Sequence, residues 1–473
     1  MRLLNHIAWQ IILSLTVSVP ALLCAQPSAG GDPAAVPKLT GSNIFTGGTL
    51  VSTDTLALTA PSGTSADPDA ATPATVLTWE ECVQLAAIHN PALEASRNNV
   101  LNADAVRKAS YSNLYPQIRA SVSGNRAYKE DNGYTNYGNS FSAQLSLTQT
   151  IFDGLATQAG IDRARAQLNH SYASLNSQKA ATSYALKSAF AQLLYAQELV
   201  ETNRDILAMR RQNERLIGLR FEGGFESKGN WLITVASRDQ AQFDLNQAVR
   251  NREVSERQLL TVIGNLNFPL PLAVSGQLRA GVLPAKPDFD QLAVRTPAYF
   301  QYQAQAEAAR AGVQIAESGW WPTISASISG GTSDDSFFPS QTASASGGVS
   351  VSYALFNGGQ TYFNVAASQA SLRQTLAQLR GGTNQAALTL AQAFKSYVDM
   401  VESVPVQEIL LSATELRYQT YKMLYDNGKA TFQDFNNNTD YYVSQQTRYL
   451  AVRRDAVIQE ANWEQARGLG AIP

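Results

Sequence analysis

Four short runs of the chain alternate apolar with polar residues at a period of two, and they fall into two pairs. The runs lie at residues 118–122, 141–147, 324–328 and 349–355. Such alternation is typical of strands with one apolar and one polar face, so we expect a β-hairpin at about residues 115–152 and another at about 321–357. Polar loops at Lys129–Gly138 and Thr332–Ser344 are expected to join the strands of each pair.

The spacing of apolar residues changes from two to three or four after each hairpin. Between Leu155 and Arg220 there is no proline, and the helical spacing is kept at Ala189, Leu193, Ala196, Val200 and Leu207. A second run of this kind extends from about Thr361 to Leu424. At about 1.5 Å per residue, either run would form a rod of about 100 Å. A long helix with a narrow apolar seam packs as a coiled coil, so we expect coiled-coil rods.

Each predicted rod ends at a glycine and is followed by a returning helix. The turns lie at about residues 221–230 and 425–434, around Gly224 and Gly428. Glycine at the end of a helix accommodates a positive φ, which a Cβ would penalise. We expect the returning helices to begin at Asn230 and Asp434, because both residue types are good N-caps.

The whole pattern occurs twice along the chain. Leu114–Ser121 returns as Trp320–Ser327, and Ile151–Gly154 returns as Leu355–Gly358, with offsets of 204 to 206. A repeat of this length indicates an internal duplication rather than a solenoid. The predicted halves, separated by a proline-rich joint, are residues 77–285 and 286–473.

The N-terminus has the features of a secretory signal peptide over residues 1–25. Arg2 supplies the positive charge, and residues 7–23 are mostly apolar. A short transmembrane anchor is the alternative. Cys24 stands where a lipoprotein signal would place its modified cysteine, although the residue before it is leucine and not a small residue. Residues 26–76 are rich in Ala, Pro, Gly, Ser and Thr, which predicts a flexible extension.

Composition and motifs narrow the possible functions. The net charge is −2, so no surface for nucleic acid is indicated. The three histidines are scattered, and no nucleotide-binding or nucleophile motif occurs. We therefore expect no catalytic residue, no metal site, no cofactor and no enzymatic activity.

The predicted strands are long enough to cross a bilayer, with a polar face suited to a water-filled lumen. The alternative is an ordinary soluble sandwich, but the chain offers no second sheet to cover the apolar faces. Four strands cannot close a barrel, and open sheet edges are not tolerated in lipid. The chain must then oligomerise. Two copies give eight strands, and three give twelve, wide enough for a channel.

Over about residues 77–473 the chain resembles the TolC-like outer membrane efflux protein family. The matching motifs are Tyr115-Pro116 and Trp321-Pro322 before the hairpins, Phe152-Asp153-Gly154 and Phe356-Asn357-Gly358 after them, and the two turns. The resemblance implies a homotrimer in the Gram-negative outer membrane. Each chain would give four strands to one β-barrel, continued into the periplasm by an α-helical coiled-coil barrel. It also implies docking to a periplasmic adaptor (membrane fusion) protein and to an inner-membrane pump or ABC exporter.

The same resemblance assigns roles to the turns. It implies adaptor docking at Phe221, Gly224, Asn230, Tyr425, Gly428 and Asp434, with a constriction at Asp434 and Asn437. Family members often carry two aspartates at the constriction, whereas Asn437 replaces the second one here. Capping of a helix is the alternative role for Asp434.

The leading hypothesis is a passive channel for multidrug efflux or type I secretion. A non-conducting coiled-coil anchor in the outer membrane is the alternative. The sequence does not name the cargo.

Overall fold

The computed structural model of the protein describes residues 75–131, 134–265, 268–336 and 343–473. The predicted signal peptide, Cys24 and residues 26–74 of the predicted extension lie outside these ranges. The last two residues of that extension belong to strand β1 (Thr75–Leu77), which differs from the flexible segment that the sequence predicted for them. They pair in parallel with β4 (Leu272–Val274), which comes from the joint between the two halves. Strand β1 therefore begins two residues before the start of regular structure that the sequence indicated, because the distant strand β4 supplies its hydrogen-bond partners.

Short helices lead into the sheet in both halves. In the first half α2 (Trp79–His89) begins with a capping box, in which the Thr78 hydroxyl and the Glu81 carboxylate each accept from the other residue's backbone N–H. Next come α3 (Pro91–Ser110) and the 3-10 turn η1 (Tyr111–Leu114). The second half has α6 (Phe289–Ala293), α7 (Pro297–Glu317) and η2 (Ser318–Trp320). Proline stands at the first position of α3 and of α7, where the missing N–H costs nothing because no residue of the helix would accept from it.

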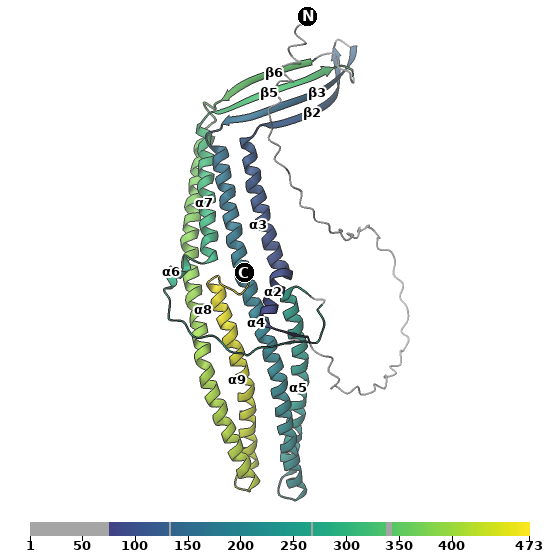
Figure 1. Ribbon diagram of the computed structural model, residues 1–473, viewed down its shortest axis with the longest axis vertical. Coiled ribbons are helices and arrows are strands. Elements are labelled where there is room, and N and C mark those ends of the chain that lie inside the picture. Colours follow the sequence, from purple (N-terminus) through teal and green to yellow (C-terminus); the bar gives the residue numbers. More distant parts are fainter. Residues whose placement is uncertain (1–74, 132–133, 266–267, 337–342) are drawn as a thin grey trace, which may run out of the picture. The chain divides into compact units, whose positions relative to one another are not determined.

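A four-stranded antiparallel sheet lies at one end of the unit (Figure 1). Its strands, in the order β2-β3-β5-β6, are β2 (Gln117–Asp131), β3 (Tyr134–Phe152), β5 (Thr323–Asp334) and β6 (Ala343–Ser352). The two hairpins are thus where the sequence predicted them, and β3 pairs with β5 to join them into one sheet.

The ends of the strands differ from the prediction. The loop expected at Lys129–Gly138 is short, because β2 and β3 stay paired as far as Asp131 and Tyr134. Tyr128 and Tyr137 face each other across this extension, with ring centroids 5.7 Å apart. In the second hairpin the expected loop Thr332–Ser344 is also shortened at both ends, since Thr332 pairs with Ala343.

Strand β6 is shorter than the alternation in the sequence suggested. We expected it to continue to residue 355, but it ends at Ser352, the partner of Thr323. The residue before Thr323 is Pro322, which has no N–H to donate to a longer ladder. Tyr353 and Leu355 are therefore exposed beyond the strand.

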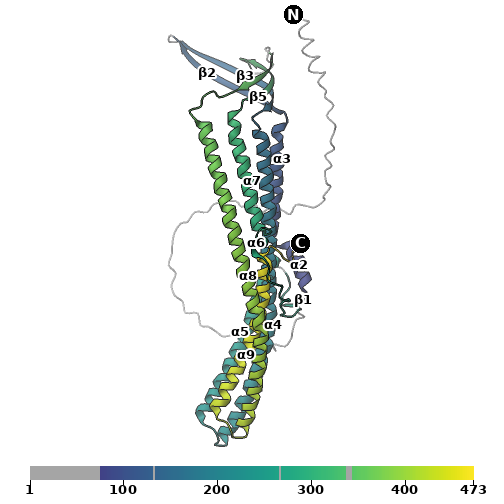
Figure 2. The same ribbon diagram turned by 90° about the vertical axis from the view of Figure 1, so that its left-hand side faces the viewer.

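Two helices of 67 residues each, α4 (Ala156–Glu222) and α8 (Gln360–Asp426), extend away from the sheet. They confirm the predicted rods, and α8 passes through Pro405 without interruption. The returning helices are α5 (Lys228–Ile263) and α9 (Phe432–Ala466). Figures 1 and 2 show the sheet at one end and the α4–α5 and α8–α9 turns at the other. No helix in the described ranges is both long and apolar enough to span a lipid bilayer.

The two long helices differ sharply in their packing. Helix α4 lies against α3, α5, α7 and α9 and buries 22 residues, among them Leu193, Ala196, Val200 and Leu207 of the predicted seam. Helix α8 packs mainly on α7 and α9 and buries only 7 residues. One face of α8 therefore has no partner among the residues that the structure describes.

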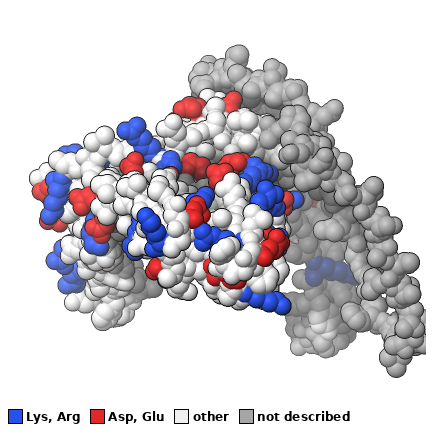
Figure 3. All heavy atoms as spheres, turned by 90° about the horizontal axis from the view of Figure 1, so that it is seen from below, with Lys and Arg blue, Asp and Glu red and all other residues white. Residues whose placement is uncertain are grey.

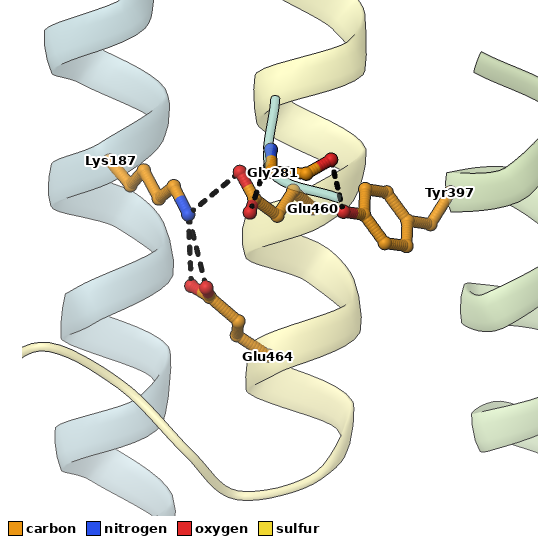
Figure 4. Close-up of polar contacts among 5 residues, drawn as sticks. All are labelled: Lys187, Gly281, Tyr397, Glu460 and Glu464. Atoms are coloured by element: carbon orange, nitrogen blue, oxygen red, sulfur yellow. Dashed lines mark hydrogen bonds and ion pairs between the residues drawn. The ribbon is translucent and has the colours of Figure 1, made fainter. Parts of the chain in front are cut away.

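The joint between the halves crosses the helices near the middle of the unit (Figure 1). Polar side chains hold it there (Figure 4). Lys187 of α4 forms ion pairs with Glu460 and Glu464 of α9, each at 3.1 Å. Glu460 also accepts from the backbone N–H of Gly281, while Tyr397 of α8 donates to the Gly281 carbonyl. Three helices are thereby tied to one segment of the joint. The largest apolar core lies at the same level, around Leu186, Leu193, Leu259 and Ile263.

Candidate functional site at the helical tips

The first tip, residues 221–230, closes α4 with a left-handed glycine. Gly224 has φ +76°, and its N–H donates to the Phe221 carbonyl at 3.0 Å. The next residue, Phe225, donates to the Arg220 carbonyl at 2.8 Å. These two bonds satisfy carbonyls that the end of a helix leaves free. A Cβ on Gly224 would meet no atom within 4 Å, so the requirement for glycine comes from φ alone.

The second tip, residues 425–434, repeats this backbone. Gly428 has φ +70°, and its N–H donates to the Tyr425 carbonyl at 2.9 Å. Lys429 donates to the Leu424 carbonyl at 2.8 Å. The prediction of a positive φ at both glycines is confirmed.

The predicted N-caps are wrong by three residues. Ser227 caps α5 and Thr431 caps α9, because both hydroxyls accept from the backbone N–H three positions later. Asn230 and Asp434 occupy those later positions. Asp434 still takes part in capping, since its carboxylate accepts from the Thr431 N–H at 3.4 Å and from the Thr431 hydroxyl at 2.6 Å. The side chain of Asn230 turns instead to Glu226, 2.7 Å away.

Aromatic rings stabilise the two tips in different ways. In the first, Phe221 stacks on Trp231 with centroids 5.4 Å apart and planes at 4°. In the second, the buried ring of Tyr425 stacks on Phe435 at 5.1 Å and 9°. Phe435 also stacks on Tyr418 of α8, and these rings share a small apolar core with Ile217 of α4.

Three residues connect the tips and form what we call the tip latch: Arg220, Glu226 and Tyr425. The Tyr425 hydroxyl donates to the Glu226 carboxylate at 2.5 Å. The Arg220 guanidinium lies 4.4 Å over the Tyr425 ring and donates to the Asp426 carbonyl at 2.8 Å. The Tyr425 hydroxyl and the Asp426 carbonyl are thus the polar groups through which the second tip contacts the first hairpin.

Electrostatics support this contact at neutral pH. Burial alone would raise the pKa of Glu226, but hydrogen bonds from Tyr425, Asn230 and the Ser227 N–H outweigh it and hold that pKa below its usual range. Burial and the bond to Glu226 raise the pKa of Tyr425 to about 12. The carboxylate therefore accepts and the phenol donates across the neutral range.

A second connection lies one level above the latch. Arg210 of α4, largely buried, forms an ion pair with Asp440 of α9 at 2.5 Å. Local sequence signals identified neither this pair nor Arg220 and Glu226. Glu226 lies between Gly224 of the turn and the capping residue Ser227. Only the packing of the α4–α5 hairpin against the α8–α9 hairpin shows that it faces Tyr425.

Asp434 and Asn437 lie one helical turn apart and are both exposed. The Asn437 side chain accepts from Gln433 at 2.7 Å, and Asp434 is engaged with Thr431. Neither forms a hydrogen bond or ion pair with the first tip. The structure therefore brings Tyr425 to the first tip but leaves the predicted constriction pair facing solvent.

The end of the unit that carries the tips bears charges of both signs. Seen from below, Lys, Arg, Asp and Glu side chains are interspersed rather than separated into single-sign areas (Figure 3). Such a surface favours specific pairing over general attraction of one charge class.

The chain is similar to proteins of one family. The sequence profile described as "Outer membrane efflux protein" matches residues 82–265 and 289–469, and each matched segment holds one hairpin, one 67-residue helix and one tip. The chain is 25% identical over 415 residues to the outer membrane protein TolC of Escherichia coli (strain K12), covering 81% of either protein. It is 22% identical over 379 residues to the outer membrane efflux protein BepC of Brucella suis, covering 78% of this chain and 80% of that protein.

The fold is also that of a solved channel. The Campylobacter jejuni CmeC outer membrane channel matches with a TM-score of 0.71 at 16% identity, over 82% of this chain and 85% of that one.

Proposed function

Because this chain belongs to the outer membrane efflux protein family, we propose that it is the outer-membrane channel of a tripartite efflux or type I secretion system. It is an outer-membrane protein that reaches into the periplasm. The conduit would be passive, and its partners would supply the energy for transport.

The observation that carries this proposal is that the single chain is incomplete on two sides. Strands β2 and β6 are the two edges of the sheet, and neither has a second neighbour among the described strands. Helix α8 exposes an apolar row at every seventh residue, with Ile409, Leu416 and Met423 exposed by 70%, 66% and 64%. An open edge in lipid and an uncovered heptad stripe both require a partner.

The partner we propose is a second copy of the chain. The open strands lie at opposite edges of the sheet, and α8 and α5 lie on opposite sides of the helical part (Figure 1). Such contacts join copies head to tail and close into a ring. Three copies give a twelve-stranded barrel, wide enough for a channel, continued by the long helices. The two matched segments support our inference that each chain is itself an internal duplication.

Aromatic residues support a position in the bilayer. Tyr115 and Trp321 are exposed just before β2 and β5, whereas Tyr128 and Tyr137 are exposed near the other end of the first hairpin. Positions 115 and 128 would lie about 30 Å apart along the membrane normal in a strand tilted by about 45°. That separation approaches the apolar thickness of an outer membrane, with aromatic girdles at both interfaces.

The tips are then the parts that meet a periplasmic adaptor and an inner-membrane pump or ABC exporter. They lie at the end of the unit opposite the sheet (Figure 2). The tip latch would hold the α8–α9 hairpin against α4, and release of that hairpin would widen the inner end of the conduit. Asp434 and Asn437 would line the constriction.

Native mass measurement in lipid tests the assembly, with a homotrimer expected. Leu416→Glu should dissociate it, because a charge would replace an apolar contact between copies. Glu415→Gln, at the neighbouring exposed position, is the matched control and should remain trimeric. A stable membrane monomer would refute the proposal. A trimer without ion conductance in planar bilayers would identify a structural anchor instead.

A further inference from the structure

The register of the sheet separates its two faces cleanly. Ile118, Leu147 and Ile328 lie side by side on one face, and the residues next to them in sequence lie on the other. That second face carries no large apolar side chain over the ranges compared. At residues 117–127, 138–150, 323–333 and 344–352, its positions hold Ser, Thr, Gln, Asn, Gly or Ala, with one exception.

The exception is Arg119 of β2. Its neighbours on the polar face are Gln117 and Ser121 along the strand and Ser146 across it, all neutral and shorter. Arg119 is exposed, and none of the described carboxylates forms an ion pair with its guanidinium. An unpaired cation among hydroxyl groups has no evident role in stabilising the sheet.

Arg126, the other arginine of the described sheet, makes a contact that stabilises the structure. Arg126 lies on the same strand but on the apolar face, paired with Asn139 in the register. Its guanidinium sits 5.0 Å over the Tyr137 ring. The two arginines therefore differ in face and in contacts, although they lie on one strand, seven positions apart.

We propose that Arg119 forms a cationic ring in the lumen of the assembled barrel and selects for anionic solutes or anionic groups on a cargo. This rests on the proposed function, since only closure of the sheet with its polar face inward creates a lumen. A barrel of twelve tilted strands has a radius of about 12 Å to the backbone, from a strand spacing of about 4.8 Å. Three extended arginines would each bridge roughly half of that distance.

The distance over which the Arg119 charge acts depends on the salt concentration. The screening length is about 10 Å in 0.1 M salt, comparable to the lumen radius, but about 3 Å in 1 M salt. Three unpaired guanidinium groups therefore favour anions over the whole cross-section at low salt and lose that effect at high salt. Carboxylate, phosphate and sulfonate groups are the chemical class this ring would attract.

Reversal potentials under a KCl gradient across planar bilayers test the proposal, using the full-length protein. Arg119→Gln should lower the ratio of chloride to potassium permeability about fivefold near 0.1 M salt, and the difference should vanish near 1 M. Glutamine already occupies this face at Gln117 and Gln144, so the substitution fits the sheet. Arg126→Gln is the matched control and should leave the ratio unchanged.

A restoring variant guards against a defect in folding. Arg119→Cys should lose anion preference and regain it after reaction with a cationic thiol reagent, since the described chain's own cysteine, Cys82, is buried. An unchanged ratio in Arg119→Gln at low salt, or an equal shift in Arg126→Gln, would overturn the inference while leaving the channel itself standing. A wild-type protein that does not conduct would refute both the inference and the proposed function.

Discussion

The two tips have the same backbone and different attachments. The same pair of hydrogen bonds closes α4 at Gly224 and α8 at Gly428, and a hydroxyl three residues further on caps the next helix in both. The side chains then diverge. The first tip closes on itself through the stack of Phe221 on Trp231. The second carries a tyrosine whose hydroxyl leaves its own hairpin and binds Glu226 of the first.

The comparison shows that the residues that form each turn are distinct from the residues that join the two tips. A left-handed glycine and a capping hydroxyl suffice for the turn, because both halves have them. The hydroxyl of Tyr425 and the carboxylate of Glu226 add an association that the first tip's Phe221 could not provide. The α8–α9 hairpin is held to the neighbouring hairpin by this polar contact and also by apolar packing of Tyr425 and Phe435 with Ile217 of α4.

The strongest way to break the shared backbone is to add a β-branched side chain at its glycines. Gly224→Val and Gly428→Val should each destabilise their tip by about 2 kcal/mol, because both glycines have positive φ and neither is crowded. Hydrogen exchange of the tip amides would measure the loss. Gly428→Val should also impair export while leaving membrane insertion intact.

Gly428→Asn is the control, because asparagine tolerates the left-handed region. Full export by Gly428→Val would show that the tip assignment is wrong. If the two Val variants lose different amounts of tip stability, the two turns have the same backbone geometry but different free energies of formation.

Removing one oxygen should weaken the attachment of the second tip to the first and leave the turn intact. Tyr425→Phe keeps the stack on Phe435 but deletes the bond to Glu226, a loss of about 1.5 kcal/mol for a hydrogen bond to a charged group. The open state of single channels should become more frequent. Phe221→Tyr, the reciprocal change, is the control and should have little effect, since Phe221 lies against Trp231. Unchanged gating in Tyr425→Phe would reduce the latch to a surface contact.

Periodicity was enough to predict the hairpins, the rods and the turns, because each is set by local spacing. Leu155–Arg220 became a helix beginning and ending within two residues of that range. Strand ends were less predictable. Polar residues such as Lys129 and Tyr134 can pair as well as form a loop, and the partner strand decides between the two.

The caps and the latch show two further limits. Ser227 and Asn230 are both residue types that cap helices, and only the backbone geometry of the turn decides which one does. Glu226 and Tyr425 are 199 residues apart, so no local pattern could connect them. The turn glycines were predictable because their requirement is contained in one residue's φ.

A smaller effect should separate capping from gating at Asp434. Asp434→Ala should weaken the second tip by about 1 kcal/mol, because Thr431 loses its reciprocal partner. Asn230→Ala should cost less, since the Asn230 side chain binds Glu226 and takes no part in the cap of α5, while its backbone N–H still donates to Ser227. Asp434→Asn keeps most of the cap and would remove three charges from the proposed trimer, so single-channel recording in multivalent cations isolates the effect of the charge. Unchanged cation selectivity and block would leave Asp434 with capping alone.

The smallest expected effect is the pH dependence of the tip latch. It distinguishes the two tips, because the stack of Phe221 on Trp231 in the first tip contains no titratable group. The pKa of Glu226 is lowered from 4.5, so its contribution is complete above about pH 4.5 and is lost as the pH falls through the lowered value. The pKa of Tyr425 is raised from 10.0 to about 12, so its contribution is complete below pH 10 and is lost as the pH rises through 12. The latch should therefore be insensitive to pH between these limits and loosen in acid.

Spin labels at Lys228 and Lys429, both exposed on the two tips, would report the distance between the hairpins. At a pH of about 3 the wild-type distribution should broaden relative to neutral pH, because a protonated Glu226 no longer accepts from Tyr425 as a charged partner. Tyr425→Phe should already be broad at neutral pH and change little further, which separates the latch from other carboxylates such as Asp434. If the wild-type protein and Tyr425→Phe broaden equally in acid, the acid effect belongs to those other groups, and the difference between the tips lies in the aromatic stacks alone.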